Sequence, residues 1–158
     1  MTEKIELTSK KEVNPNWIRP DLKHERGEIE RVLRGFLGET ANKENMKRIM
    51  DILENAPMVE LSEKLWESID NTDSFHNIRP GHPEDAETKV EEYNQELAPE
   101  NKRNFKRHLK CYLNGTPMET PIIIKNKEGI LHLVSGNTRL MVARALGVKP
   151  KVVIGEYN

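Results

Sequence analysis

The sequence has little of what marks secreted, metal-binding or membrane-spanning proteins. It holds one cysteine, Cys111, among 158 residues. A single thiol forms no internal disulfide, which fits a reducing compartment, and with scattered histidines it makes no closed zinc site. No apolar run approaches the roughly 18 residues that a membrane span requires. We therefore expect a cytoplasmic protein with no metal site of its own and no membrane partner.

Aromatic residues are also scarce, at 5%, and apolar residues make up 35% of the chain. The apolar residues nevertheless recur at helical or strand spacing, which favours a modest core over disorder. Charge is segregated: residues 1–100 contain 14 Lys/Arg and 23 Asp/Glu, whereas residues 101–158 contain 11 and 3. Either an acidic segment packs against a basic one, or a basic face is kept for an anionic ligand.

The spacing of apolar residues predicts an α+β protein in three parts. Residues 1–22 are predicted as an extended arm, anchored by Trp17 and Ile18. Residues 23–115 are predicted to be helical and to pack on the C-terminal part, with a turn-rich loop over 70–83. Residues 116–158 are predicted as a small mixed sheet that carries a helix from Thr138 to Leu146, so that all β structure lies in this last part.

The predicted caps and strands divide these parts further. The first helix is expected over 24–37, and two more are expected to begin after N-caps at Asn42 and Ser62. Two further helices are expected over 84–97 and 100–114, the last ending at Gly115. The strands are expected over 121–125, 130–134 and 152–154.

One polar turn, Ser135-Gly136-Asn137-Thr138-Arg139, lies between a predicted strand and a predicted helix. Backbone N–H groups at such a turn point toward the positive end of the helix dipole, which suits a phosphate group. Arg139 in the first helical turn can add a charge-assisted hydrogen bond. The alternative is structural, with Asn137 as a helix cap and Arg139 as a solvated surface charge.

This turn resembles the nucleotide-binding turn of the ParB/sulfiredoxin-like superfamily, which carries Gly-x-x-Arg between a strand and a helix. Gly136 and Arg139 match, and the similarity covers roughly residues 117–156. The Gly-Asn-Thr-Arg-Leu form is similar to that of small tailed-phage proteins with one such domain at the C-terminus, which would place this chain in the host cytoplasm. Asn137 stands where sulfiredoxins have their cysteine, so the resemblance does not imply sulfinic-acid reduction.

The resemblance implies binding of a nucleoside triphosphate, ATP or CTP, together with Mg²⁺, through Ser135, Gly136, Asn137, Thr138 and Arg139. It also implies phosphoryl transfer to a small molecule, a nucleotide or a modified base. Transfer requires a carboxylate to hold Mg²⁺ or to accept a proton. The candidates near loops are Asp70, Asp73, Asp85 and Glu119, and we take Glu119, Asp70 and Asp73 as the catalytic set. Whether the chain is an enzyme at all stays open.

The alternative function is non-enzymatic, as a DNA-binding or protein-interaction module. A basic stripe supports it, made of Lys102, Arg103, Lys106, Arg107 and Lys110 with His108 beside it. Such a stripe either contacts nucleic-acid phosphates or forms a solvated helix face. A nuclease is the weakest alternative, because the sequence holds no metal-ligand cluster.

Overall fold

The structure is a computed structural model that describes residues 15–158. The first fourteen residues of the predicted arm lie outside this part. The chain is α+β, as predicted, and forms two compact units. Unit 1 comprises the described residues up to Ile18 together with Asp73–Met118 and Asn137–Pro150. Unit 2 comprises Arg19–Thr72, Glu119–Gly136 and Lys151–Asn158.

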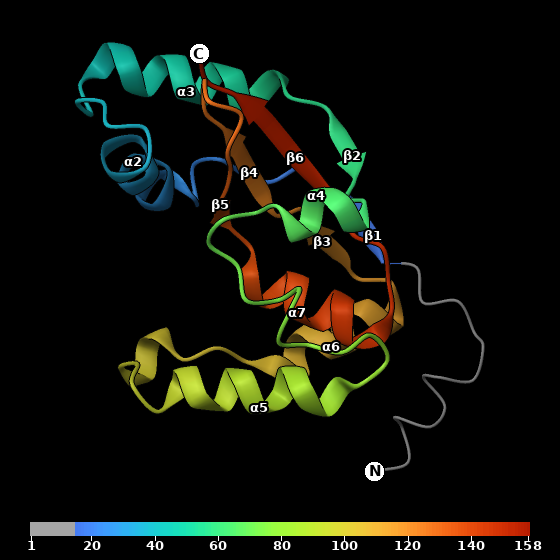
Figure 1. Ribbon diagram of the computed structural model, residues 1–158. Helices are drawn as coiled ribbons and strands as arrows, with labels where there is room; N and C mark the ends of the chain where they lie inside the picture. The colour runs from blue at the N-terminus through green and yellow to red at the C-terminus, as the bar shows by residue number, and fades with distance from the viewer. Residues whose placement is uncertain (1–14) are drawn as a thin grey trace. The chain divides into compact units, whose positions relative to one another are not determined.

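Unit 2 contains a four-stranded mixed sheet (Figure 1). Its strands, in spatial order, are β2 (Met58–Glu60), β6 (Lys151–Glu156), β4 (Ile122–Lys125) and β5 (Leu131–Ser135). β6 runs parallel to β4 and antiparallel to β2, and β4 pairs antiparallel with β5. The continuous apolar run Ile122-Ile123-Ile124 is fully buried, because β4 lies inside the sheet with covered faces.

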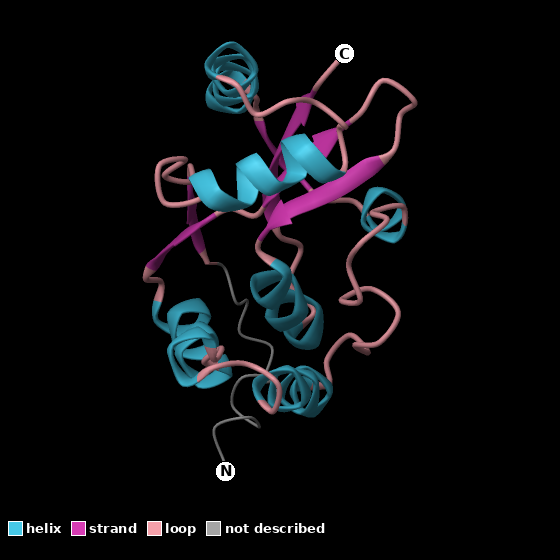
Figure 2. Ribbon diagram, turned by 90° about the vertical axis from the view of Figure 1, so that its left-hand side faces the viewer, coloured by secondary structure: helices cyan, strands magenta, loops and turns pink. Residues whose placement is uncertain are grey.

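Two helices, α2 (Arg26–Gly35) and α3 (Lys43–Asn55), pack on this sheet. Figure 2 views the sheet from the side of α2, which crosses in front of the magenta strands. The predicted cap of α3 is confirmed, because Asn42 accepts a hydrogen bond from the N–H of Asn45 at 2.8 Å. Ser62 caps the short helix α4 (Glu63–Glu67) in the same way.

The expectation that all β structure lies after residue 115 is wrong. β2 lies inside the region predicted to be helical and joins the sheet along β6. A further strand, β1 (Asn16–Ile18), pairs with β3 (Pro117–Glu119) in a two-stranded sheet. Strands of three residues are too short to show alternation, so the sequence pattern could not reveal them.

Unit 1 is built around three helices, α5 (Pro83–Asn94), α6 (Phe105–Asn114) and α7 (Asn137–Leu146), with α7 in contact with both others. A single 3₁₀ turn over Pro99–Asn101 precedes α6. α6 ends at Gly115 in the left-handed conformation (φ 73°), as its predicted cap required. Trp17 meets Tyr112 of α6 edge-on, with ring centroids 5.6 Å apart, whereas Ile18, the other predicted anchor of the arm, is exposed.

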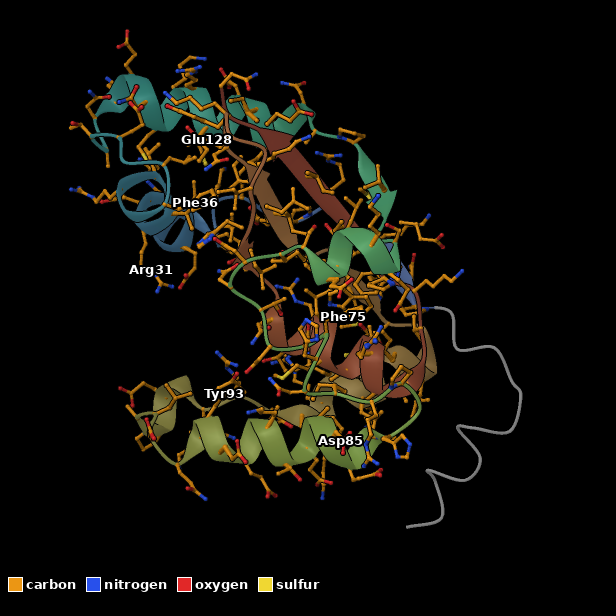
Figure 3. The ribbon with its side chains drawn as sticks, viewed as in Figure 1. Arg31, Phe36, Phe75, Asp85, Tyr93 and Glu128 are labelled. Atoms are coloured by element: carbon orange, nitrogen blue, oxygen red, sulfur yellow. The ribbon has the colours of Figure 1, made fainter. Side chains whose placement is uncertain are left out.

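The loop before α5 is held by charged and aromatic contacts within unit 1. The Arg79 guanidinium donates to both carboxylate oxygens of Asp85, at 2.8 and 3.0 Å, and Asp85 also accepts the Arg79 backbone N–H. The guanidinium of Arg144 lies 4.1 Å from the ring centroid of Phe75. Figure 3 labels Phe75 and Asp85. Asp85, considered above as a metal-facing carboxylate, is thus committed to ordering this loop.

Among the described residues, no helix has the length and apolar character needed to cross a membrane.

We predict that the Arg79–Asp85 pair makes the stability of unit 1 depend on acid. The hydrogen bonds from Arg79 lower the pKa of Asp85 to about 2. A carboxyl group with a lowered folded-state pKa stabilises the fold above its ordinary pKa and loses this contribution as the pH falls. Asp85→Asn should therefore lower the Tm at pH 7, and its difference from the parent should shrink between pH 4 and pH 2. Glu91→Gln, which removes an exposed carboxylate from the same helix, is the control. A Tm difference that is constant from pH 7 to pH 2 would contradict the assignment.

Candidate functional site

Gly136, at the predicted phosphate turn, is required by packing. Its φ is 108°, which side-chain-bearing residues rarely adopt. A Cβ built on Gly136 would lie 2.6 Å from Cβ of Pro121 and 2.8 Å from its Cα. The glycine is therefore explained within unit 2, whether or not a ligand approaches it. Ser135 precedes it as the last residue of β5, and its buried hydroxyl has no hydrogen-bond partner among the described residues.

The first turn of α7 belongs to unit 1 and begins at Asn137. The amide of Asn137 donates to a carboxylate oxygen of Asp73 at 3.2 Å. Thr138 is buried, and the carbonyl of Arg139 accepts a hydrogen bond from the hydroxyl of Tyr112 at 2.8 Å. Burial raises the pKa of Tyr112, so this hydroxyl stays a donor. The bond fixes the start of α7 against α6.

A half-buried histidine lies within electrostatic range of three arginines at this place. His108 lies one turn before Tyr112 on α6, and burial is the first cause that lowers its pKa to about 4. The positive charges of Arg139, Arg107 and Arg103 lower it further. His108 is therefore neutral at pH 7, so one nitrogen of its ring carries no proton. We call this set, His108 with Arg103, Arg107 and Arg139, the arginine cluster.

Arg103 is held in place by an aromatic ring and by an asparagine side chain. Its guanidinium lies 4.5 Å from the ring centroid of Tyr93, which Figure 3 labels on α5. The side chain of Asn94 accepts the backbone N–H of Arg103 at 2.7 Å and donates to its carbonyl at 2.8 Å. A stacked guanidinium has lost much of its rotamer freedom, so less entropy remains to be lost when an anion binds.

The predicted basic stripe is divided by the fold. Arg103 is half-buried and shares the environment of His108 with the more exposed Arg107. Lys102, Lys106 and Lys110 are exposed to solvent. Within the described residues no ion pair joins basic α6 to acidic α5, whose pairs are formed with Arg79, His82 and its own Lys89.

The three carboxylates taken as catalytic have different surroundings. Asp73 contacts Asn137 at the start of α7. Asp70 accepts a hydrogen bond from Nδ1 of His132 at 2.7 Å, within unit 2. Glu119 accepts the backbone N–H of Asp21 at 3.0 Å, also within unit 2. The contact between Asp73 and Asn137 joins this carboxylate to a residue of the predicted turn.

His132 is a functional candidate that the sequence did not reveal. The Asn71 side chain accepts the N–H of Leu133 at 2.6 Å and donates to its carbonyl at 2.9 Å, which fixes the amide orientation. Its nitrogen then faces Nε2 of His132 at 3.3 Å, so Nε2 is the acceptor and Nδ1 carries the proton given to Asp70. The only sequence signal was a polar residue alternating with Leu131 and Leu133.

The described residues contain no group of three or more His, Cys, Asp or Glu arranged to hold a metal ion. No protein-family model matches the chain, and neither a curated protein nor a solved structure matches it.

We predict that Gly136→Ala destabilises the protein even without a ligand. The new methyl group meets Pro121, and the backbone would be strained at φ 108°. Strain and overpacking of this kind typically cost about 1–3 kcal/mol each. Equilibrium denaturation measures the loss. Gly27→Ala in α2, where a Cβ meets nothing within 4 Å, is the control and should be neutral or stabilising. Equal stabilities of the two variants would refute this account of Gly136.

We also predict that Asn71→Ala destabilises unit 2. The substitution removes two hydrogen bonds to the backbone of Leu133 on the edge strand β5. A typical hydrogen bond contributes about 0.5–1.5 kcal/mol, so we expect a loss of roughly 1–3 kcal/mol in denaturation experiments. Faster amide exchange at Leu133 would locate the effect. Asn77→Ala, which truncates an exposed asparagine on the following loop, should leave both measurements unchanged.

Proposed function

We propose that unit 1 binds the phosphate groups of a nucleotide at the start of α7, through Arg139 together with Arg103 and Arg107. The observation that carries this proposal is the arginine cluster, in which the positive charges of Arg139, Arg107 and Arg103 all act on a half-buried histidine whose pKa is lowered to about 4. Two like charges 4 Å apart repel by about 1 kcal/mol in water and about 4 kcal/mol near a protein surface. An anion converts this repulsion into attraction, and guanidinium groups match phosphate oxygens in geometry.

The segregated charge of the sequence supports the same proposal. One explanation was that the acidic segment neutralises the basic one. In the described residues, however, Arg103 packs on the ring of Tyr93, and no ion pair connects α5 with α6. Within this described part of the chain, Arg103 and Arg107 therefore form no ion pair with the acidic helix α5, which favours an anionic ligand.

Asp73 fits a role in holding Mg²⁺ with the phosphates. Magnesium is usually bound by one or two carboxylates and the phosphates of its substrate, and does not need a complete protein cage. Asp73 supplies one carboxylate, and its contact with Asn137 keeps it at the start of α7. When bound there, Mg²⁺ would neutralise phosphate charge. The chain's own residues would orient the phosphates through Arg139, Arg103 and Arg107.

The resemblance to the ParB/sulfiredoxin-like superfamily points the same way, because Gly136 and Arg139 occupy the positions of its nucleotide-binding turn. We extend the proposal to ATP-dependent or CTP-dependent phosphoryl transfer. Asp73 would be the carboxylate involved, because it contacts Asn137 of the turn. Transfer is tested separately from binding, by Mg²⁺-dependent release of phosphate or nucleoside diphosphate in the parent and in Asp73→Asn.

We predict that phosphate binding raises the pKa of His108. The bound negative charge offsets the three arginines, so His108 should titrate above its pKa of about 4 when inorganic phosphate, ATP or CTP is present. NMR of the imidazole signals across pH 3–8 measures the shift. Arg139→Ala should weaken binding about tenfold or more, because a charged hydrogen bond contributes about 1.5–3 kcal/mol. Arg107→Ala should have a similar effect.

Lys106→Ala is the matched control, since it removes one positive charge from an exposed position on the same helix. It should leave the affinity for phosphate unchanged. If neither phosphate nor a nucleotide shifts His108, or if Lys106→Ala weakens binding as much as Arg139→Ala, the proposed site is wrong. Salt-dependent binding of duplex DNA that is lost with Lys106 and Lys110 would favour the nucleic-acid alternative.

A further inference from the structure

We propose that unit 2 has a second binding site, a cavity between α2 and β5 that takes a planar heterocycle of the nucleobase type. This site does not depend on the phosphate site proposed for unit 1, because its ligand needs no phosphate. The cavity has a volume of about 410 Å³, within the range of roughly 300–1,000 Å³ that is usual for small-molecule sites.

The walls of the cavity are mainly apolar and include four polar side chains. Val32, Phe36, Leu133 and Val134 supply apolar surface, and Gly35 leaves space at the end of α2. Ligand sites typically combine such walls with a few polar groups that fix orientation. Here the polar groups are Glu28, Arg31, Asn71 and His132.

The aromatic wall is rigid. Phe36 and His132 stack nearly parallel, with ring centroids 4.1 Å apart and an angle of 12°. His132 cannot turn without losing Asp70 at Nδ1 and Asn71 at Nε2. Both ring nitrogens are therefore occupied, and we expect the stacked pair to offer a ligand the outer face of a ring. Planar rings stack on such surfaces, and each stacked base contributes about 1–3 kcal/mol in nucleic-acid-binding proteins.

Two of the polar residues that line the cavity place a hydrogen-bond acceptor beside a hydrogen-bond donor. Glu28 and Arg31 lie one helical turn apart on α2 and form an exposed ion pair, in which the carboxylate and the guanidinium are adjacent. Figure 3 labels Arg31 and Phe36 at this helix. A heterocycle with an N–H next to a carbonyl or ring nitrogen can donate to the carboxylate and accept from the guanidinium. Nucleobases carry such edges, whereas simple aromatic hydrocarbons do not.

Titration of the full-length protein with the free nucleosides adenosine, guanosine, cytidine and uridine tests the site, followed by NMR of the amide signals of Phe36, His132 and Leu133. We expect at least one nucleoside to bind at millimolar concentration or below and to move these signals. Arg31→Ala, which alters an exposed residue and leaves the core intact, should weaken binding at least fivefold. Phe36→Leu, which removes the stacking ring, should do the same.

Arg34→Ala is the matched control. Arg34 lies on the same helix and pairs with Glu30 as Arg31 pairs with Glu28, but it does not line the cavity. It should leave nucleoside binding unchanged. The proposal is overturned if no nucleoside binds, if Arg31→Ala and Phe36→Leu both bind like the parent, or if benzyl alcohol binds as tightly as the nucleosides. Because none of these probes carries phosphate, failure here leaves the arginine cluster of unit 1 untouched, and the reverse also holds.

Discussion

The close approach of Gly136 to Pro121 determines how β5 ends and α7 begins. Pro121 is itself fixed, because its carbonyl accepts the N–H of Val153 on β6 at 3.0 Å, and the next residue, Ile122, pairs with both Val153 and Ser135. A side chain at position 136 would have to displace this segment, and with it the central strand pairing of the sheet. The turn that resembles a phosphate-binding motif is therefore also the point at which the sheet requires a glycine.

Short elements in both units rely on asparagine side chains to complete their backbone hydrogen bonds. Asn71 pairs with the N–H and carbonyl of Leu133, and so covers part of the free edge of β5. Asn94 pairs in the same way with Arg103. An amide offers a donor and an acceptor side by side, as a neighbouring strand does. In each unit this arrangement also positions a residue of a proposed site, His132 in one case and Arg103 in the other.

The sequence was informative where the local signal was strong. Asn42 and Ser62 could be predicted as caps because capping depends on residues within one turn. The strand β2 could not be predicted, since its pairing with β6 joins residues about 95 positions apart and leaves no local pattern. For the same reason the sequence did not reveal His132 as a functional candidate, since its orientation depends on the distant residues Asp70 and Asn71. His108 was predictable in part, because it lies on the face of α6 that carries Phe105 and Tyr112.

The lowered pKa of His108 among the positive charges of the arginine cluster is the main physical reason to propose a ligand there. Burial holds His108 neutral, and an apolar residue of similar size would fill the same space without a desolvation cost. The positive charges of Arg139, Arg107 and Arg103 each disfavour the protonated form of His108, and the guanidinium of Arg103 packs on the ring of Tyr93. Functional sites often retain such unfavourable charge arrangements because a ligand of opposite charge relieves them. The ligand that we propose for this cluster, an anion with several oxygens such as a phosphate group, would supply the opposite charge.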